Sequence, residues 1–247
     1  MKSERSYPIY KVNKKAEASL VGGHPWVYEN DILEFPETES ENGTLADVVS
    51  PKGAYLGTGF VSLKSKIRVR LISRNANDTF DASFWRRRVE YAWAYRKTVL
   101  EPADLSACRV IFGEADQFPG LTVDRFNNIL VTQTLSVGME KLKPILFPLL
   151  AEVLRADGQT IDGIYERNDE ALRAKEGLEQ SKGWFELPGI FMAMAGYDPN
   201  EAVAFWTRMA NASAGKQPEF LSTHPADEKR IAKLKAAIPE ALKYKKN

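Results

Sequence analysis

The chain has 247 residues with a formal net charge of +1 at pH 7, and 44% of the residues are hydrophobic. This length suits one large domain or two small ones, and the near-neutral charge excludes a global basic field, so any nucleic-acid surface must be local. The single cysteine, Cys108, excludes an intramolecular disulfide. We find no signal peptide and no 18-residue apolar run, so we expect a cytoplasmic protein without a membrane partner.

Residues 1–75 are typical of a small β-structure. Strand-like segments occupy residues 9–12, 46–50, 54–62 and 66–73, whereas GGHPWVY at 22–28 has the composition of a loop. In the last of these strands Ile67, Val69 and Leu71 alternate with basic residues. This alternation predicts one apolar and one basic face, and therefore a small β-barrel with a basic strand face on its surface.

Residues 76–188 change to a mixed pattern. After a polar break, Asp81 or Ser83 is expected to cap a helix over residues 84–100. Strands are predicted at 108–112, 121–126 and 129–135, with a tight turn at Asn127-Asn128. A helix at 139–155, a strand at 162–166 and a helix at 170–178 follow. The fold class is therefore α+β, with an α/β domain after the barrel.

Residues 189–247 form the third predicted region. A helix ends at Gly196, Asp198-Pro199-Asn200-Glu201 is typical of a helix start, and the last helix opens at Pro225. We expect a helical hairpin, docked weakly on the α/β domain. Its apolar residues, which need new cover or self-association, are Phe205, Trp206, Met209, Ile231 and Leu234.

Several basic residues of the barrel are candidate contacts for RNA phosphates. Lysine and arginine suit this role because each neutralised phosphate releases condensed counterions, and Trp26 is placed to stack on an unpaired base. The alternative is a charged strand face that is simply solvated. The basic candidates are Lys14, Lys15, Lys64, Lys66, Arg68, Arg70 and Arg74.

The segments KVNKKAEASLVGGHPWVYENDI and GTLADVVSPKGAYLGTGFVSLKSKIRVRLIS, followed by the run FGEAD, PGL and VDR, support one resemblance. Residues 7–188 resemble the N-terminal PUA domain and following α/β domain of bacterial rRNA 5-methylcytosine methyltransferases. The resemblance implies RNA, and rRNA in particular, as the partner of residues 1–75. By position it adds Gly22, Gly23, His24 and Pro25 to Lys14 and Trp26 as RNA-binding candidates.

The chain also departs from that family. Members continue into a Rossmann-like domain that binds S-adenosylmethionine through a glycine-rich turn and supplies a catalytic cysteine. After Leu187 the chain has neither, so we expect no cofactor site and no catalytic residue. We interpret Cys108 as a core residue, and Glu114, Asp116 and Asp124 as groups that accept hydrogen bonds in loops rather than as acids, bases or metal ligands.

The end of the chain supports a second resemblance. FMAMAGYDPNEAVAFWTRMANAS and FLSTHPADEKR place residues 190–246 close to the C-terminal part of HtpX-like zinc metallopeptidases. That family holds zinc with an HExxH helix and a later glutamate, but the chain has no HExxH and no such glutamate. His224 alone does not make a catalytic zinc site, so we expect no metal.

These observations predict a chimera joined near residues 186–191. The leading hypothesis is an RNA-binding protein derived from an rRNA methyltransferase but lacking its S-adenosylmethionine domain. The alternatives are a methyltransferase component whose catalytic domain is supplied by another chain, and a zinc metallopeptidase remnant.

Overall fold

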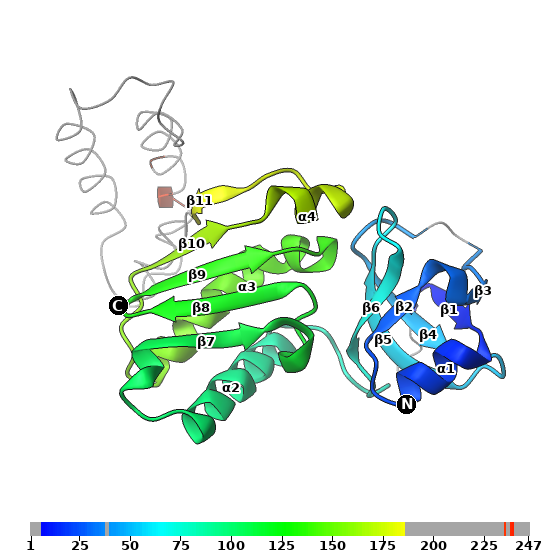
Figure 1. The fold of residues 1–247 in the computed structure, drawn as a ribbon, viewed down its shortest axis with the longest axis horizontal. Helices are drawn as coiled ribbons and strands as arrows, with labels where there is room; N and C mark the ends of the chain where they lie inside the picture. The colour runs from blue at the N-terminus through cyan, green and yellow to red at the C-terminus, as the bar shows by residue number, and fades with distance from the viewer. Residues whose placement is uncertain (1–5, 38–39, 186–234, 236–237, 240–247) are drawn as a thin grey trace. The chain divides into compact units, whose positions relative to one another are not determined.

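The computed structural model describes residues 6–37 and 40–185, together with Lys235, Ile238 and Pro239. The chain divides into two compact units, residues 1–184 and 185–247. The first unit contains two β-sheets and the helices that pack on them, which confirms the α+β class (Figure 1). The predicted hairpin over residues 189–247, its self-association and the site around His224 lie outside the described residues.

The first sheet has six strands in the order β2-β6-β5-β4-β1-β3, and it curls around an apolar core. Its strands are antiparallel except for the β1–β4 pair. The core contains Val12, Leu20, Val27, Val48 and Val69, all essentially inaccessible to solvent. The elements are β1 (Ile9–Val12), α1 (Lys14–Val21), β2 (Trp26–Tyr28), β3 (Ile32–Glu34), β4 (Leu45–Val49), β5 (Tyr55–Val61) and β6 (Ile67–Ser73).

Helix α1 and strand β2 differ from the prediction, which placed no helix at residues 14–21 and a loop at 22–28. The helix begins because the Asn13 side chain accepts a hydrogen bond from the Ala16 amide at 2.8 Å. Ala16 and Leu20 then face the barrel core. A helix of only eight residues carries too short an apolar stripe to stand out in the sequence.

The second sheet has five strands in the order β11-β10-β9-β8-β7, and helices α2 and α3 cover the same face of it (Figure 1). The predicted helices and the strands up to β10 are confirmed, and Asn127 adopts a left-handed conformation in the β8–β9 turn. The predicted Asp81 cap is confirmed as well, since its side chain accepts from the Phe84 amide. The elements are α2 (Ala82–Val99), β7 (Ala107–Phe112), β8 (Leu121–Phe126), β9 (Ile129–Thr134), α3 (Val137–Ala156), β10 (Gly163–Arg167), α4 (Glu170–Lys175) and β11 (Lys182–Trp184), with short 3-10 turns η1 (Glu29–Asp31), η2 (Asp104–Ser106) and η3 (Gly113–Asp116).

A buried ion pair joins the barrel to the second sheet. Arg70 on β6 donates to both carboxylate oxygens of Glu176, which follows α4, at 2.6 and 3.2 Å. Ser62 donates to the same carboxylate at 2.9 Å. Beside this pair the Phe60 ring lies directly on Gly138 of α3 and stacks on Trp85 of α2. Both sheets therefore belong to one continuous unit, and the predicted boundary near residue 75 stays a prediction.

The interpretation of Arg68 and Arg70 as a solvent-facing basic strand face is wrong. Both residues are buried, with 8% and 7% of their surface exposed. Arg68 is paired with Glu29 at 2.5 Å and donates to the Ser62 carbonyl, while Arg70 is paired with Glu176. The apolar side of β6 faces the barrel core as predicted, but on the opposite side Arg68 is covered within the barrel and Arg70 by the segment after α4.

A second charged network lies under α3. Lys143 contacts Glu166 and Glu140, both at 2.6 Å, and Glu140 also pairs with Arg173 at 2.8 Å. Burial alone would raise the pKa of Glu140, but the hydrogen bonds from Arg173 and Lys143 outweigh burial and lower this pKa below its ordinary value of 4.5.

This shift predicts acid sensitivity. Because the folded pKa of Glu140 is depressed, its contribution to stability is complete above the unfolded pKa and is lost as the pH falls through the folded pKa. We expect the urea midpoint to fall in this acidic window. Glu140→Gln should be less stable at pH 7 and should lose less on acidification; an equal loss in both proteins would contradict the assignment.

Candidate nucleic-acid interface

The loop between α1 and β2 presents a cluster of aromatic rings. Gly22 caps α1 and Gly23 turns the chain with a φ of 101°, a value that favours glycine. The His24 ring then stacks against Tyr28, with centroids 6.2 Å apart, and meets the edge of Trp26 at 5.5 Å. An aromatic cluster of this kind offers faces on which unpaired bases stack.

Arg74 supports this loop from behind. Its guanidinium donates to the Leu20 carbonyl at 3.3 Å and to the His24 carbonyl at 3.1 Å. Arg74, which was predicted to contact an RNA phosphate, therefore uses part of its guanidinium to hold the backbone of this loop. By satisfying the Leu20 carbonyl in the last turn of α1 and the His24 carbonyl in the loop, Arg74 ties the loop to the end of the helix.

Trp26 was predicted to stack on an unpaired base, but its side chain is also held by a hydrogen bond within the protein. Its indole N–H donates to the Glu114 carboxylate at 2.9 Å, so the ring bridges the barrel and the loop after β7. Tyr28, two residues along the same strand, is 38% exposed. The prediction missed Tyr28, although the period-two spacing of Trp26 and Tyr28 around the buried Val27 would have indicated it.

The four candidate lysines lie in two places. Lys14 and Lys15 are exposed in the first turn of α1. Lys64 and Lys66 are exposed between β5 and β6, where the Lys66 carbonyl accepts from the Glu29 amide directly after Tyr28. The Lys64 stem lies over Gly177, where an added Cβ would be 2.2 Å from its Cδ. The structure thus leaves the lysines accessible and removes Arg68 and Arg70 from the surface.

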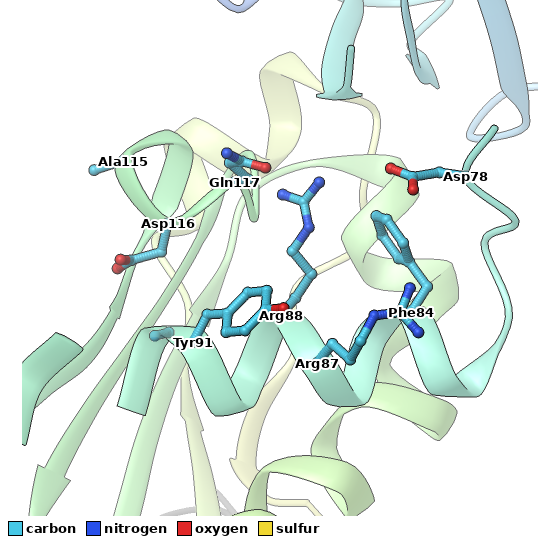
Figure 2. Close-up of a pocket in the computed structure, with 9 residues that line it drawn as sticks. Asp78, Phe84, Arg87, Arg88, Tyr91, Ala115, Asp116 and Gln117 are labelled. Carbon is cyan, nitrogen blue, oxygen red and sulfur yellow. The ribbon is translucent and has the colours of Figure 1, made fainter. Parts of the chain in front are cut away.

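A cavity of about 430 Å³ lies between α2, the segment before it and η3 (Figure 2). Its lining includes Asp78, Phe84, Arg87, Arg88, Tyr91 and Gln117. Glu114, which receives the Trp26 hydrogen bond, lies next to Ala115 at the edge of this cavity. Strand β2, which carries Trp26, and the cavity are therefore linked through the short turn η3.

Arg88 is the central charge of the cavity. It donates to the Ile72 carbonyl at 2.7 Å, and its guanidinium lies 4.7 Å from the centre of the Phe84 ring. Its Nη1 is buried and has no hydrogen-bond partner among the described residues. Burial lowers the pKa of Arg88, although the Asp78 carboxylate opposes this effect.

The acidic candidates are satisfied within the protein. Asp116 accepts from the Phe112 amide at 2.6 Å and pairs with Arg96, as expected for a loop carboxylate. Asp124 instead makes a two-point pair with Arg109, at 2.7 and 3.0 Å. Glu114 also binds a side chain, that of Trp26. Of the three carboxylates, Asp116 is therefore the one that accepts a hydrogen bond from the loop backbone, as predicted.

Cys108 is half-buried at the start of β7 rather than fully enclosed in the core. Its Sγ lies 3.5 Å from the Leu105 carbonyl. Burial raises the pKa of the thiol, which favours the unreactive protonated form at neutral pH. A thiol in this state does not suit a nucleophile.

The described residues do not fit the cofactors of the two resembled families. Among them no group of three His, Cys, Asp or Glu side chains is placed to hold a metal ion. Helices α1 to α4 follow Asn13, Asp81, Ser136 and Asp169, and none of these turns has the glycine-rich sequence of a dinucleotide-type site. In the same part of the chain, no helix is long and apolar enough to cross a membrane.

Comparison with known proteins relates the two ends of the chain to different families. A family model described as a PUA-like domain matches residues 11–74, and the model for peptidase family M48 matches residues 188–238. Ribosomal RNA large subunit methyltransferase I of Klebsiella pneumoniae is 34% identical over 177 residues, which are 72% of this chain and 43% of that protein. The same enzyme of Shewanella denitrificans is 37% identical over 182 residues, 73% of this chain and 45% of that protein.

A solved structure from Streptococcus mutans, described as a SAM-dependent methyltransferase, has the same fold over 65% of this chain and 40% of its own length. The TM-score is 0.55 and the sequence identity is 18%, so this match supports the fold alone. The chain spans less than half the length of the curated relatives named above. Residues 11–74 thus form a PUA-like domain, and this domain together with the α/β fold after it is similar to the N-terminal part of ribosomal RNA large subunit methyltransferase I.

Proposed function

We propose that residues 6–185 form an RNA-binding unit directed at structured ribosomal RNA. The observation that carries this proposal is the aromatic cluster of His24, Trp26 and Tyr28 in the PUA-like domain, which also carries accessible lysines. The cluster supplies faces for unpaired bases, and Lys14, Lys15 and Lys66 supply charges for the neighbouring phosphates. The similarity to rRNA methyltransferases supports ribosomal RNA as the target.

We further propose that this unit binds RNA without transferring a methyl group itself. No turn among the described helix starts suits S-adenosylmethionine, and the half-buried Cys108 does not suit a nucleophile. The sequence after residue 188 matches an M48 peptidase model where the resembled family continues into its catalytic domain. Recognition of RNA is the activity that the described residues support.

Salt dependence provides the direct test. Log K for an rRNA hairpin should fall linearly with log salt, because each phosphate contact releases counterions. Lys14→Ala with Lys15→Ala should weaken binding and reduce the slope by roughly 2, about one unit per lost contact. Filter binding at several salt concentrations measures both quantities. Lys182→Ala, on the edge strand β11 of the other sheet, is the control; a flat salt profile in the wild-type protein would overturn the proposal.

The similarity to methyltransferases favours one second candidate, a methyltransferase component completed by a catalytic domain on another chain. Calorimetric titration with S-adenosylmethionine of the full chain, alone and in the complex isolated with it from cells, separates the two functions. A chain that only binds RNA should give no binding heat in either sample, whereas binding heat from the complex alone would favour the second candidate; tight binding to the isolated chain would contradict both.

A further inference from the structure

We propose that the cavity lined by Arg88, Tyr91 and Gln117 receives one unstacked nucleotide of the bound RNA. This inference rests on the proposed function and extends the interface from the barrel onto helix α2. The nucleotide pocket, as we call this cavity, combines a suitable size, an exposed aromatic rim and hydrogen-bonding groups of both kinds.

The volume and rim of the nucleotide pocket suit a single base. Its volume of about 430 Å³ lies within the usual range of small-ligand sites. Tyr91 stands on the rim and is 68% exposed, although it is a large aromatic residue. Base–aromatic stacking needs such an accessible ring face and does not depend on base identity.

Arg88 supplies an unused donor. One terminal nitrogen is held by the Ile72 carbonyl, whereas the buried Nη1 has no partner. A buried donor without an acceptor is energetically costly, and Nη1 is covered in the empty cavity, so we expect the Arg88 side chain to turn toward an acceptor atom that enters the nucleotide pocket. Figure 2 shows the Arg88 side chain extending from α2 toward Gln117.

The nucleotide pocket also contains acceptors, which distinguishes a base from a simple anion. Asp78 accepts from Ser73 at 2.6 Å and from Asn75 at 3.1 Å, but it remains a negative charge on the wall. This charge would repel a bare phosphate inside the cavity. A base edge carries both donors and acceptors, so it can face Arg88 and Asp78 at once.

Arg87 provides a place for the phosphate of the same nucleotide. It is exposed at the mouth of the cavity and donates a hydrogen bond of 3.4 Å to the Ser83 hydroxyl. On the opposite side, the Asp116 carboxylate is already paired with Arg96. An RNA chain crossing α2 would therefore meet a positive charge outside the cavity and mixed polarity within it.

The nucleotide pocket is connected to the barrel interface by a rigid turn. Trp26 holds Glu114 on η3, and Gln117, which ends this turn, adopts a left-handed φ of 64°. The Phe118 amide closes the turn onto the Gly113 carbonyl at 2.9 Å. The short turn therefore lies between the aromatic cluster and the pocket, so RNA bound at the cluster continues across it toward the pocket.

The test compares two RNAs and three variants of the full chain. We expect Tyr91→Ala and Arg87→Gln each to weaken binding of a hairpin with an unpaired loop by roughly fivefold or more, from the usual stacking and charge terms. Neither variant should change the affinity for a fully paired duplex. Arg86→Gln is the matched control, because Arg86 precedes them on the same helix and pairs with Glu152 at 2.7 Å.

Competition by small ligands tests the same proposal in the wild-type protein. Ribonucleoside monophosphates should compete with the hairpin and inorganic phosphate should not. Equal competition by phosphate, or a Tyr91→Ala variant that binds the hairpin as the wild type does, would overturn the inference. If that variant is unchanged while the Lys14/Lys15 variant is impaired, only the pocket fails; a wild type that binds neither RNA refutes the proposed function itself.

Discussion

Replacing Glu176 with alanine is expected to lower the free energy of unfolding by about 3–5 kcal/mol. The substitution leaves the Arg70 guanidinium in a site where only 9% of its side chain is exposed, without the carboxylate that accepts its two shortest hydrogen bonds. Ser62 loses its acceptor as well. An uncompensated buried charge costs far more than the net value of the pair, which explains the size of the effect.

Urea denaturation of the single and double variants measures this energy. Arg70→Met combined with Glu176→Leu removes both charges and should recover much of the stability, because no buried charge is left unpaired. Lys175→Ala, at the exposed neighbouring position, should change little. A loss of less than 1 kcal/mol for Glu176→Ala would show that the barrel and α4 separate easily.

Replacing Trp85 with alanine is expected to cost about 3–5 kcal/mol through loss of burial and creation of a cavity. Trp85 is 1% exposed and contacts the rings of Phe84 and Phe118, with centroids 5.0 and 5.9 Å away. It also stacks on Phe60 of the barrel at 6.1 Å. The change should therefore weaken the second sheet and its junction with the barrel together.

Thermal and urea unfolding test this expectation, with Tyr91→Ala as the control. Tyr91 lies on the same helix and is also aromatic, but it is mostly exposed, so its loss should change stability by less than about 0.5 kcal/mol. Equal destabilisation by the two substitutions would contradict the assignment of Trp85 to the junction. The same control shows that Tyr91→Ala is folded when its RNA affinity is measured.

Local patterns predicted much of the second sheet. The strand at 121–126 and its neighbour after Asn127 follow a period of two, and the Asp81 cap marks the start of α2. Helix α1 was missed because its single cap and short apolar stripe are weak signals. Strand β2 was missed because the residues before it are glycine, histidine and proline, which are typical of loops.

The candidate interface was predicted less completely. The resemblance identified His24 and Trp26, and the structure places both in one aromatic cluster. The alternation along residues 66–73 pointed to Arg68 and Arg70 as surface groups, yet both are buried in ion pairs. The nucleotide pocket was not predicted at all, because Asp78, Arg88 and Gln117 share no motif and come from separate segments.

Neighbouring residues were therefore enough to predict which side of β6 faces the barrel core and where the longer helices begin. What lies against the opposite face of β6 depends on residues far away in the chain. Glu176, more than one hundred residues after Arg70, turns a basic strand face into a buried ion pair. Trp26 and Glu114, 88 residues apart, bring the nucleotide pocket beside the aromatic cluster, since long-range contacts are set by packing and leave no local pattern.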